Sequence, residues 1–345
     1  MTHLPCFAPL RHALALALPV VALTAAPAAA QNPITRASVG PAGNEGKKDS
    51  GALSRPAFSR DGRFLAFDSN AGNFVGGDSN GVADVFVKEL ATGALVRVSV
   101  ATNGTQGDRD SAGPSLSGDG RFVAFHSFAT TLVSGDTNSS PDVFLHDRDP
   151  DGNGIFDEGN GVTTCVSVSS AGAPSNSSSL GAAVSDDGHY VAFQSSSTDL
   201  VSGDTNQRTD VFLRDVVAGT TIAISVDVTG TTLGNDWCYL PVISGDGARV
   251  AFASSASNLV AGDTNGWLDV FVRDWAAGTT VRASVDSAGV EGDGESYDPC
   301  LSGDGSVVAF TSWSTNLVPI DVNGMFDAFV HELATGVTSL ASLES

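Results

Sequence analysis

One ten-residue pattern, Phe58-Ser59-Arg60-Asp61-Gly62-Arg63-Phe64-Leu65-Ala66-Phe67, decides the fold because the chain contains it five times. The other copies are residues 116–125, 184–193, 243–252 and 301–310. The glycine of the Asp-Gly pair lies at 62, 120, 188, 247 and 305, so the copies are 58, 68, 59 and 58 residues apart. Self-similarity at a fixed period is typical of repeat architectures. Four repeats therefore have nearly equal lengths, and one carries an insertion.

Each repeat predicts four short β-strands. Asp-Gly between two apolar runs is a strong hairpin signal, so the first strand ends just before it. The second strand, residues 64–67 in the first copy, is apolar at every position, as expected for a strand that is covered on both faces. A long loop then leads to a third strand such as residues 84–87, and a Thr-Gly turn leads to a fourth such as residues 96–100.

Repeated four-stranded units that cannot bury their own faces predict a β-propeller, because radial stacking covers both faces of each blade. We predict an all-β protein with five four-stranded blades in a single domain, residues 31–345. The repeats span approximately residues 54–100, 112–168, 180–227, 239–286 and 297–342. Residues 34–39 match the fourth strand of the fourth repeat, so we expect an extra N-terminal strand there that pairs with the first or last blade and closes the ring.

The composition excludes some classes of function. The chain has 345 residues, with 17 Lys and Arg against 39 Asp and Glu, and a net charge of −22. Such a chain is unsuited to binding a nucleic-acid backbone, which requires basic residues that displace counterions. Hydrophobic residues make up 41%, which is enough for a buried core and too much for a disordered chain.

The N-terminus has the pattern of a secretory signal peptide. Residues 1–30 contain Arg11, an apolar run over residues 13–23, and Ala28-Ala29-Ala30 as a cleavage site. The apolar run is too short to span a bilayer. We therefore expect an exported protein, periplasmic or secreted, with a cleaved signal peptide over residues 1–30. We expect it to be a monomer without a membrane span or a nucleic-acid partner.

Three cysteines remain after residue 30, namely Cys165, Cys238 and Cys300. An odd number leaves at least one of them unpaired within the chain. Cys238 and Cys300 lie near equivalent places in neighbouring repeats. A bridge between these two and three separate buried thiols are both open interpretations.

The repeats resemble the TolB-like, WD-repeat-like propeller family of exported bacterial proteins. The motifs that carry the resemblance are Ser-x-Asp-Gly-Arg-x-Val-Ala-Phe-x-Ser, Asn-Leu-Val-x-Gly-Asp-Thr-Asn and Asp-Val-Phe-Val-Arg-Asp, and it covers about residues 34–342. The resemblance implies the propeller fold. Fold analogy is a weak guide to function, so what it implies about function is limited to a binding or scaffold role.

The insertion in the second repeat, residues 147–160, is the best single motif. Residues 147–158 fit the calcium-loop pattern D-x-[DN]-x-[DN]-G-x5-E, in which spaced oxygens converge on a hard cation. The predicted calcium ligands are Asp147, Asp149, Asp151, Asn153 and Glu158. Strands rather than helices flank this loop. An acidic hairpin tip without a metal is the alternative interpretation.

A second acidic motif recurs in every blade, in the loop before the third strand. Its constant Asp-x-Asn-x-x-x-Asp spacing indicates either a structural turn or a weak calcium site, since Asp and Asn also close turns on their own backbone. The aspartates of this motif are Asp78, Asp84, Asp136, Asp142, Asp204, Asp210, Asp263, Asp269, Asp321 and Asp327.

The connections that enter the first strands differ between blades, and variable loops on a rigid scaffold often bind ligands. In a propeller these connections gather at one mouth of the central channel. The possible ligand-binding residues there are Asp108, Asp110, Asn176, Asn235, Asp236, Trp237, Asp293, Glu295, Tyr297 and Asp298. Ordinary solvated polar loops are the alternative interpretation.

The sequence therefore favours a non-catalytic binding or scaffold module with a protein or glycan ligand at one mouth of the ring and calcium as a stabilising ion. The competing hypothesis is a carbohydrate-active hydrolase that uses a pair of channel-mouth carboxylates. No residue is assigned a catalytic role, because we find no nucleophile elbow and no zinc-binding histidine spacing.

Overall fold

The computed structural model describes residues 35–321 and 323–342. The predicted signal peptide lies outside the described residues. All of the described strands lie in one compact unit that begins at Ala37. In the described residues no helix is long and apolar enough to cross a membrane.

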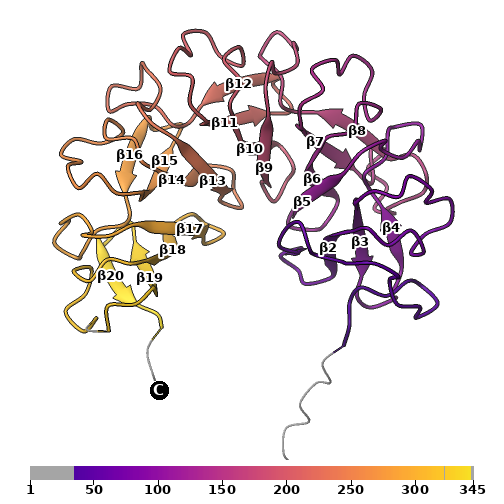
Figure 1. Ribbon diagram of the computed structural model, residues 1–345, viewed down its shortest axis with the longest axis horizontal. Helices are drawn as coiled ribbons and strands as arrows, with labels where there is room; N and C mark the ends of the chain where they lie inside the picture. Colours follow the sequence, from indigo (N-terminus) through magenta and orange to yellow (C-terminus); the bar gives the residue numbers. More distant parts are fainter. Residues whose placement is uncertain (1–34, 322, 343–345) are drawn as a thin grey trace, which may run out of the picture. The chain divides into compact units, whose positions relative to one another are not determined.

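The described residues form the five four-stranded blades of a β-propeller, as predicted (Figure 1). In each sheet the strands are antiparallel and follow the order of the chain. The first and second blades consist of β1 (Ala57–Phe58), β2 (Phe64–Ser69), β3 (Asp84–Glu89), β4 (Leu95–Arg97), β5 (Ser111–Leu116), β6 (Phe122–Ser127), β7 (Asp142–Asp147) and β8 (Val162–Cys165).

The remaining three blades repeat this arrangement. They consist of β9 (Ser179–Val184), β10 (Tyr190–Ser195), β11 (Asp210–Asp215), β12 (Thr220–Ala223), β13 (Cys238–Ile243), β14 (Arg249–Ser254), β15 (Asp269–Asp274), β16 (Thr279–Arg282), β17 (Ser296–Leu301), β18 (Val307–Ser312), β19 (Asp327–Glu332) and β20 (Val337–Leu340).

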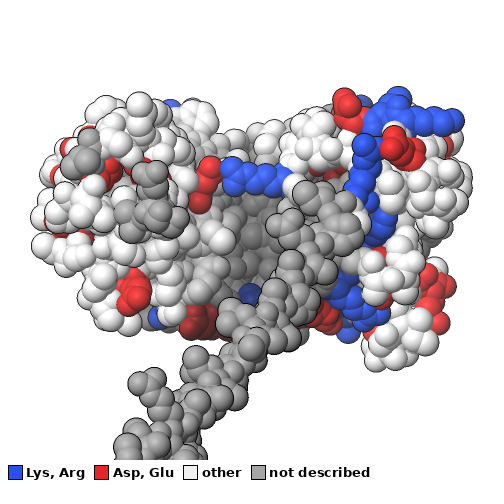
Figure 2. All heavy atoms as spheres, turned by 90° about the horizontal axis from the view of Figure 1, so that it is seen from below, with Lys and Arg blue, Asp and Glu red and all other residues white. Residues whose placement is uncertain are grey.

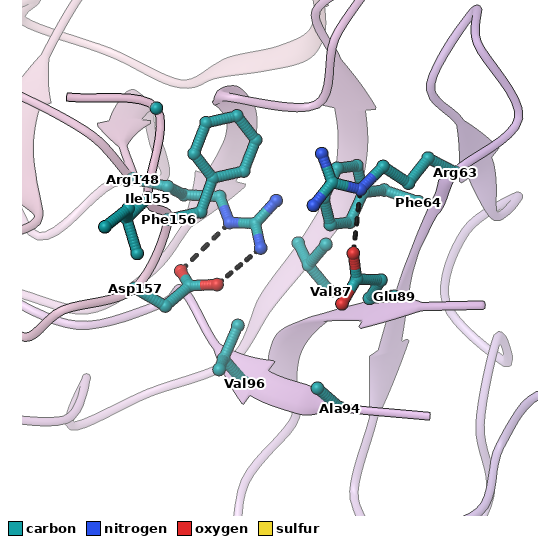
Figure 3. Close-up of a pocket in the computed structure, with 11 residues that line it drawn as sticks. Arg63, Phe64, Val87, Glu89, Ala94, Val96, Arg148, Ile155, Phe156 and Asp157 are labelled. Carbon is teal, nitrogen blue, oxygen red and sulfur yellow. Dashed lines mark hydrogen bonds and ion pairs between the residues drawn. The ribbon is translucent and has the colours of Figure 1, made fainter. Parts of the chain in front are cut away.

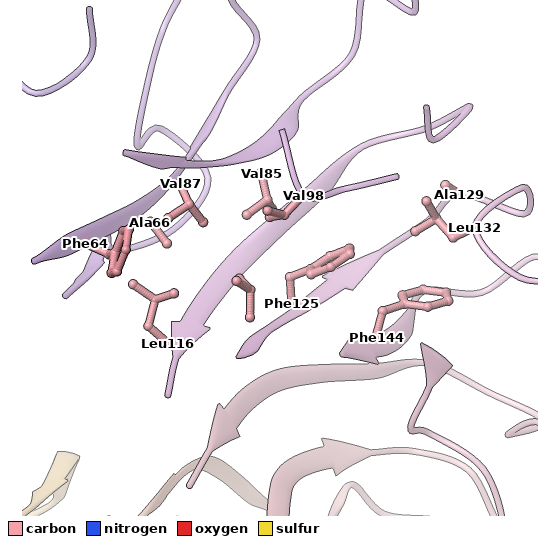
Figure 4. Packing of buried hydrophobic residues seen from close by; sticks show 11 residues of the cluster. Phe64, Ala66, Val85, Val87, Val98, Leu116, Phe125, Ala129, Leu132 and Phe144 are labelled. Carbon is pink, nitrogen blue, oxygen red and sulfur yellow. The ribbon is translucent and has the colours of Figure 1, made fainter. Parts of the chain in front are cut away.

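The core consists of apolar layers between consecutive blades. In the layer between the first two blades, Val85 and Val87 pack with Leu116 and Phe125, and none of these side chains is more than 8% exposed (Figure 4). Three further clusters join the second blade to the third, the third to the fourth and the fourth to the fifth. Burial of one such large side chain stabilises the fold by about 1.5–3 kcal/mol. The apolar run within each second strand is therefore explained by the neighbouring elements that cover both of its faces.

The repeated serine of the Ser-x-Asp-Gly motif closes the hairpin between the first two strands. In the second blade, Ser117 Oγ accepts the N–H of Phe122 at 2.9 Å and donates to Asp119 at 2.9 Å. Gly120 has a φ of 77°, a left-handed conformation that glycine adopts without steric cost. The same contacts occur at Ser59, Ser185, Ser244 and Ser302. These serines are structural turn residues.

A buried aspartate at the start of the third strand fixes the preceding loop in each blade. In the second blade, Asp142 is 1% exposed and accepts hydrogen bonds from Asn138 Nδ2 at 2.9 Å and Ser167 Oγ at 2.6 Å. Ser167 Oγ also accepts the N–H of Val143 at 3.1 Å. The equivalent aspartates are Asp84, Asp210, Asp269 and Asp327. The second aspartate of the loop motif therefore holds the loop backbone in every blade.

The predicted N-terminal closing strand is not formed in the described residues. Of residues 37–39, Val39 makes only an isolated bridge to Glu45, and no strand forms. Lys88 Nζ in β3 donates to the carbonyl oxygens of Ala37 and Val39 at 2.9 Å each. The segment therefore lies against the first blade and does not pair with a strand of the last. The physical reason is that Ala37 covers the apolar cluster on the outer face of the first blade.

The first and last blades differ from the others in their packing. Among the buried clusters of the described residues, none joins the first blade to the fifth. Ala309 and Val330 of the fifth blade are only half-buried, whereas the equivalent Ala251 and Val272 of the fourth blade are buried. In the described residues, the first and fifth blades therefore do not share an apolar layer of the kind that lies between consecutive blades.

The buried aspartate network predicts a specific loss of stability. The substitution Ser167→Ala removes both the hydrogen bond to Asp142 and the acceptor of the Val143 N–H. We expect the free energy of unfolding to fall by about 1–3 kcal/mol, because buried polar groups lose their partners. Denaturant unfolding measures the change. Ser134→Ala, at an exposed serine of the same blade, is the control. Equal effects of the two substitutions would contradict the role of the network.

Candidate functional site

The first strands of all five blades line a central cavity of about 380 Å³. Most of the lining is apolar, including Leu116, Val184, Val242 and Leu301. Asp186 is the only carboxylate among the residues that line this cavity. The interior of the channel thus offers apolar contact and lacks the two carboxylates that a glycosidase places around its substrate.

An ion pair crosses the end of the channel at which the Asp-Gly turns lie. Arg60 Nε of the first blade lies 3.0 Å from Asp186 Oδ2 of the third blade. Gly303 provides the room for this crossing, because a Cβ added there would lie 1.6 Å from an Arg60 nitrogen. This end of the channel is therefore bridged by charged side chains.

A second ion pair joins two blades at the opposite mouth, where Arg55 Nη2 lies 3.0 Å from Asp298 Oδ2. Asp298 has a φ of 49° and Leu240 has a φ of 55°, at the bulge where other blades carry Gly113 and Gly181. A side chain in this left-handed region costs of order 1 kcal/mol. The fourth and fifth blades therefore carry side chains at a backbone position that favours glycine.

A polar layer at the same mouth was not found by sequence reasoning. Asp68 is 1% exposed and accepts hydrogen bonds from Ser54 Oγ and, at 3.1 Å, from the N–H of Leu53. Burial lowers the pKa of His126, and its Nδ1 is buried without a hydrogen-bond partner. The imidazole is therefore neutral at pH 7. The only sequence signal for Asp68 and His126 is that both stand at the variable position x of the otherwise constant Ala-Phe-x-Ser motif.

Five of the predicted mouth residues anchor loops. Asp108 accepts the N–H of Thr130 at 2.8 Å, and Asp293 accepts the N–H of Thr315 at 2.7 Å. Asn176 and Asn235 make equivalent contacts in the third and fourth blades. Asp110 accepts the N–H of Ala83 at 2.8 Å. These side chains are used within the scaffold and do not converge on a common point.

The other predicted mouth residues lie within an aromatic surface. Trp237 is 41% exposed, with the Arg208 guanidinium 5.5 Å and the Tyr239 ring 6.5 Å from its ring. In the fifth blade, Phe326 lies 5.9 Å from Tyr297 and 5.3 Å from Trp313. We call Trp237, Tyr239, Tyr297, Trp313 and Phe326 the aromatic mouth.

Carboxylates accompany these rings. Burial raises the pKa of Tyr239, and the nearby charges of Asp236 and Glu295 raise it further. Asp236 also lies 3.6 Å from Arg208 Nε. The structure therefore brings Asp236, Trp237, Glu295, Tyr297 and Asp298 to the mouth formed by the fourth and fifth blades. Sequence reasoning missed Tyr239, Trp313 and Phe326 because Tyr239 lies inside β13 and the other two lie at the end of the second strand and in the following loop.

The insertion packs against the first blade and encloses a cavity of about 310 Å³ (Figure 3). Arg148 is 2% exposed, pairs with Asp157 and donates to the carbonyl oxygen of Gly120 at 2.7 Å. Its guanidinium lies 4.6 Å from the Phe64 ring and 5.0 Å from the Phe156 ring. These contacts hold the insertion in place.

The five predicted calcium ligands of the insertion have different hydrogen-bond partners. Both carboxylate oxygens of Asp147 accept hydrogen bonds from Arg121 at 2.8 Å. Asp149 accepts the N–H groups of Asn153 at 3.0 Å and Gly154 at 2.9 Å, while Asn153 Nδ2 donates to Asp151 and Glu158. In the part of the chain that the structure describes, no group of three or more His, Cys, Asp or Glu side chains is arranged to hold a metal.

On the face of the molecule that Figure 2 shows, most Lys and Arg side chains lie on the right of the view with acidic side chains beside them, and uncharged residues cover most of the remaining described surface. The cysteines are free thiols in the described structure, with Cys238 buried and Cys300 exposed. Of the two interpretations of the cysteines, the structure thus has no bridge between Cys238 and Cys300.

No protein-family model and no curated protein matches this sequence. Solved structures are similar in fold. A protein from Agrobacterium tumefaciens assigned as TolB is 15% identical, with a TM-score of 0.49 over 85% of this chain and 80% of that chain. TolB from Acinetobacter baumannii is 14% identical, with a TM-score of 0.46 over 82% of this chain and 52% of that chain.

An oligogalacturonate lyase in complex with manganese is also 14% identical, with a TM-score of 0.48 over 82% of this chain and 63% of that chain. The chain thus spans about half of the Acinetobacter protein and less than two thirds of the lyase. At these identities the likeness concerns the β-propeller fold alone. The chain has structural similarity to TolB-like β-propeller proteins.

Proposed function

We propose that this β-propeller is a non-catalytic binding module that takes a glycan at the aromatic mouth. The observation that carries the proposal is the set of partly exposed rings on two neighbouring blades, with Trp237 41%, Trp313 50% and Phe326 42% exposed. Large exposed apolar side chains beside polar groups are typical of binding sites.

The chemistry of this surface suits a sugar. Trp and Tyr combine a rigid apolar ring with a polar group, so they supply contact area at a low cost in conformational entropy. Asp236 and Glu295 lie near Tyr239 and can accept hydrogen bonds from sugar hydroxyl groups. The polypeptide strands hold these residues on a rigid scaffold. A protein ligand is the other class that aromatic and arginine side chains would suit.

The hydrolase hypothesis has less support. A glycosidase needs two carboxyl groups on opposite sides of the scissile bond. The channel-mouth carboxylates available for this role are Asp108, Asp110, Asp293, Glu295 and Asp298. Asp108, Asp110 and Asp293 hold loop backbone and Asp298 pairs with Arg55, which leaves Glu295 of this set. A binding role uses the same surface without requiring a free carboxyl pair.

We also propose that calcium stabilises the insertion. Asp147 is engaged by Arg121 and Asp149 by two backbone N–H groups, so the charged oxygens that remain for a cation are those of Asp151 and Glu158, which share the Asn153 Nδ2 donor. Oxygen ligands of this type suit calcium. The ion would reinforce the contact of the insertion with the first blade. Export to the periplasm or medium, where calcium is plentiful, remains part of this proposal and rests on residues 1–30.

Glycan binding is tested with the mature chain by affinity electrophoresis in gels that contain a soluble polysaccharide, one polysaccharide per gel. We expect at least one polysaccharide to retard the protein. Trp237→Ala and Trp313→Ala should each weaken binding about 5- to 150-fold, because each removes a central aromatic contact worth about 1–3 kcal/mol.

The control is Val217→Ala, at a 73% exposed apolar residue in the turn after β11. Equal retardation of the two tryptophan variants and the unaltered chain would contradict the aromatic mouth as the binding site. Release of new reducing ends from a bound polysaccharide would contradict the non-catalytic assignment.

The calcium proposal predicts that the variant Asp151→Ala/Glu158→Ala binds one calcium ion fewer than the unaltered chain in equilibrium dialysis. Its thermal stabilisation by calcium should be smaller, by about 3 kcal/mol at a hundredfold excess over the dissociation constant. Magnesium should not substitute, because it demands a tighter octahedral shell. Glu332→Ala, at an exposed glutamate of the fifth blade, is the control. An unchanged number of bound ions would contradict calcium binding by the insertion.

A further inference from the structure

One position on the fourth strand distinguishes the blades from one another. It is the residue that pairs with the phenylalanine of the Asp-Val-Phe or Asp-Ala-Phe motif in the third strand. This residue is Arg97 in the first blade, Cys165 in the second, Ala223 in the third, Arg282 in the fourth and Leu340 in the fifth.

Where the residue is arginine, its guanidinium neutralises the two aspartates of the repeated loop. Arg282 Nη1 lies 3.2 Å from both Asp263 Oδ1 and Asp269 Oδ2, and 2.9 Å from Glu291 Oε2. Arg97 Nη1 in the first blade lies 3.3 Å from Asp78 and 3.4 Å from Asp84. Both arginine side chains are at most 10% exposed. The loop thus directs oxygens from both aspartates to one buried point.

The third blade keeps this carboxylate pair and lacks the cation. Asp204 is 8% exposed, and neither of its carboxylate oxygens has a hydrogen-bond partner. Asp210 is fully buried and accepts hydrogen bonds from Asn206 at 2.7 Å and Ser225 at 2.8 Å, both uncharged donors. The residue at the arginine position is Ala223, the smallest of the five.

Two buried carboxylates without a counter-charge are strongly unfavourable. Removing a charge from water costs several kcal/mol unless a partner compensates it. Burial raises the pKa of Asp210 to about 7, and the neighbouring charge of Asp204 contributes to this increase. Burial also raises the pKa of Asp204. The nearby N–H of Asn206 lowers that pKa only in part, and it does not form a hydrogen bond of normal geometry with the carboxylate. Either a cation or a proton must therefore neutralise the pair.

We propose that the third blade binds a calcium ion between Asp204 and Asp210, at the point that an arginine nitrogen occupies in the first and fourth blades. Carboxylate oxygens are preferred calcium ligands, and water completes the shell of six to eight oxygens. Ala223 is the smallest of the five residues at this position and therefore obstructs an ion there least. Asp136 in the second blade and Asp321 in the fifth also have carboxylate oxygens without a hydrogen-bond partner, but there Cys165 and Leu340 place a larger side chain at this position.

The site is independent of the insertion, so it is tested in the variant Asp151→Ala/Glu158→Ala. Isothermal titration of the chelator-treated variant with calcium should show binding. Adding Ala223→Arg should abolish that binding, because the guanidinium takes the place of the ion as it does in the fourth blade. The chelated Ala223→Arg protein should also unfold at a higher temperature than its parent.

Ala223→Leu is the matched control for size. It should also lose calcium binding, without the rise in unfolding temperature, because leucine fills the space and brings no charge. Asp204→Asn keeps the shape of the side chain and should weaken calcium binding at least about tenfold, since one of the two charged ligands is removed.

The proposal is overturned if Ala223→Arg and Asp204→Asn both bind calcium as tightly as their parent. It is also overturned if the parent binds no calcium and the pair instead takes a proton. In that case the unfolding temperature of the chelated parent falls as the pH rises from about 4 to about 7, between the ordinary pKa of an aspartate and the raised pKa of Asp210, and calcium does not reverse the fall.

Discussion

A buried carboxylate in each blade is the constraint on which the rest of the structure depends. The aspartate that begins the third strand ties the long preceding loop, through an asparagine, to a serine that follows the fourth strand. In the second blade these residues are Asp142, Asn138 and Ser167. Charge-assisted hydrogen bonds are stronger than neutral ones, and the low dielectric of the interior makes the loss of any member costly. One polar network therefore sets the geometry of a loop that has no regular secondary structure.

This network allows the surface to vary. Arg208, Trp267 and Met325 occupy the same exposed place, two residues before the buried aspartate, in the third, fourth and fifth blades. Trp237 and Tyr297 lie at the channel mouth, where the first strands of the fourth and fifth blades begin. Because the network holds the loop backbone, these side chains can differ between blades without loss of the fold. The proposed glycan site and the proposed cation site both arise where one blade departs from the common pattern.

Periodicity was sufficient to predict the five blades and the hairpin turns at the Asp-Gly pairs, since the spacing of these pairs and of the apolar runs reflects local geometry. The site was predicted only in part. Asp108 and Asp293 have the residue type expected of a ligand-binding carboxylate. Their carboxylates instead accept hydrogen bonds from Thr130 and Thr315, which lie 22 residues further along the chain. Trp313 and Phe326 were missed because their proximity depends on how the strands pair. Asp204 lacks the arginine that pairs with its counterparts in the first and fourth blades, and only the sheet register shows that Ala223 stands at the arginine position.

Native-state hydrogen exchange tests the central role of the buried networks most directly. The N–H groups of Val85, Val143, Val211 and Val270 donate to the network serines of the first four blades. If the networks hold the blades together, these amides exchange only through global unfolding, with the slowest rates in the chain. Exchange of these amides at the rate of the surface loops would show that the networks open locally, and it would contradict this account.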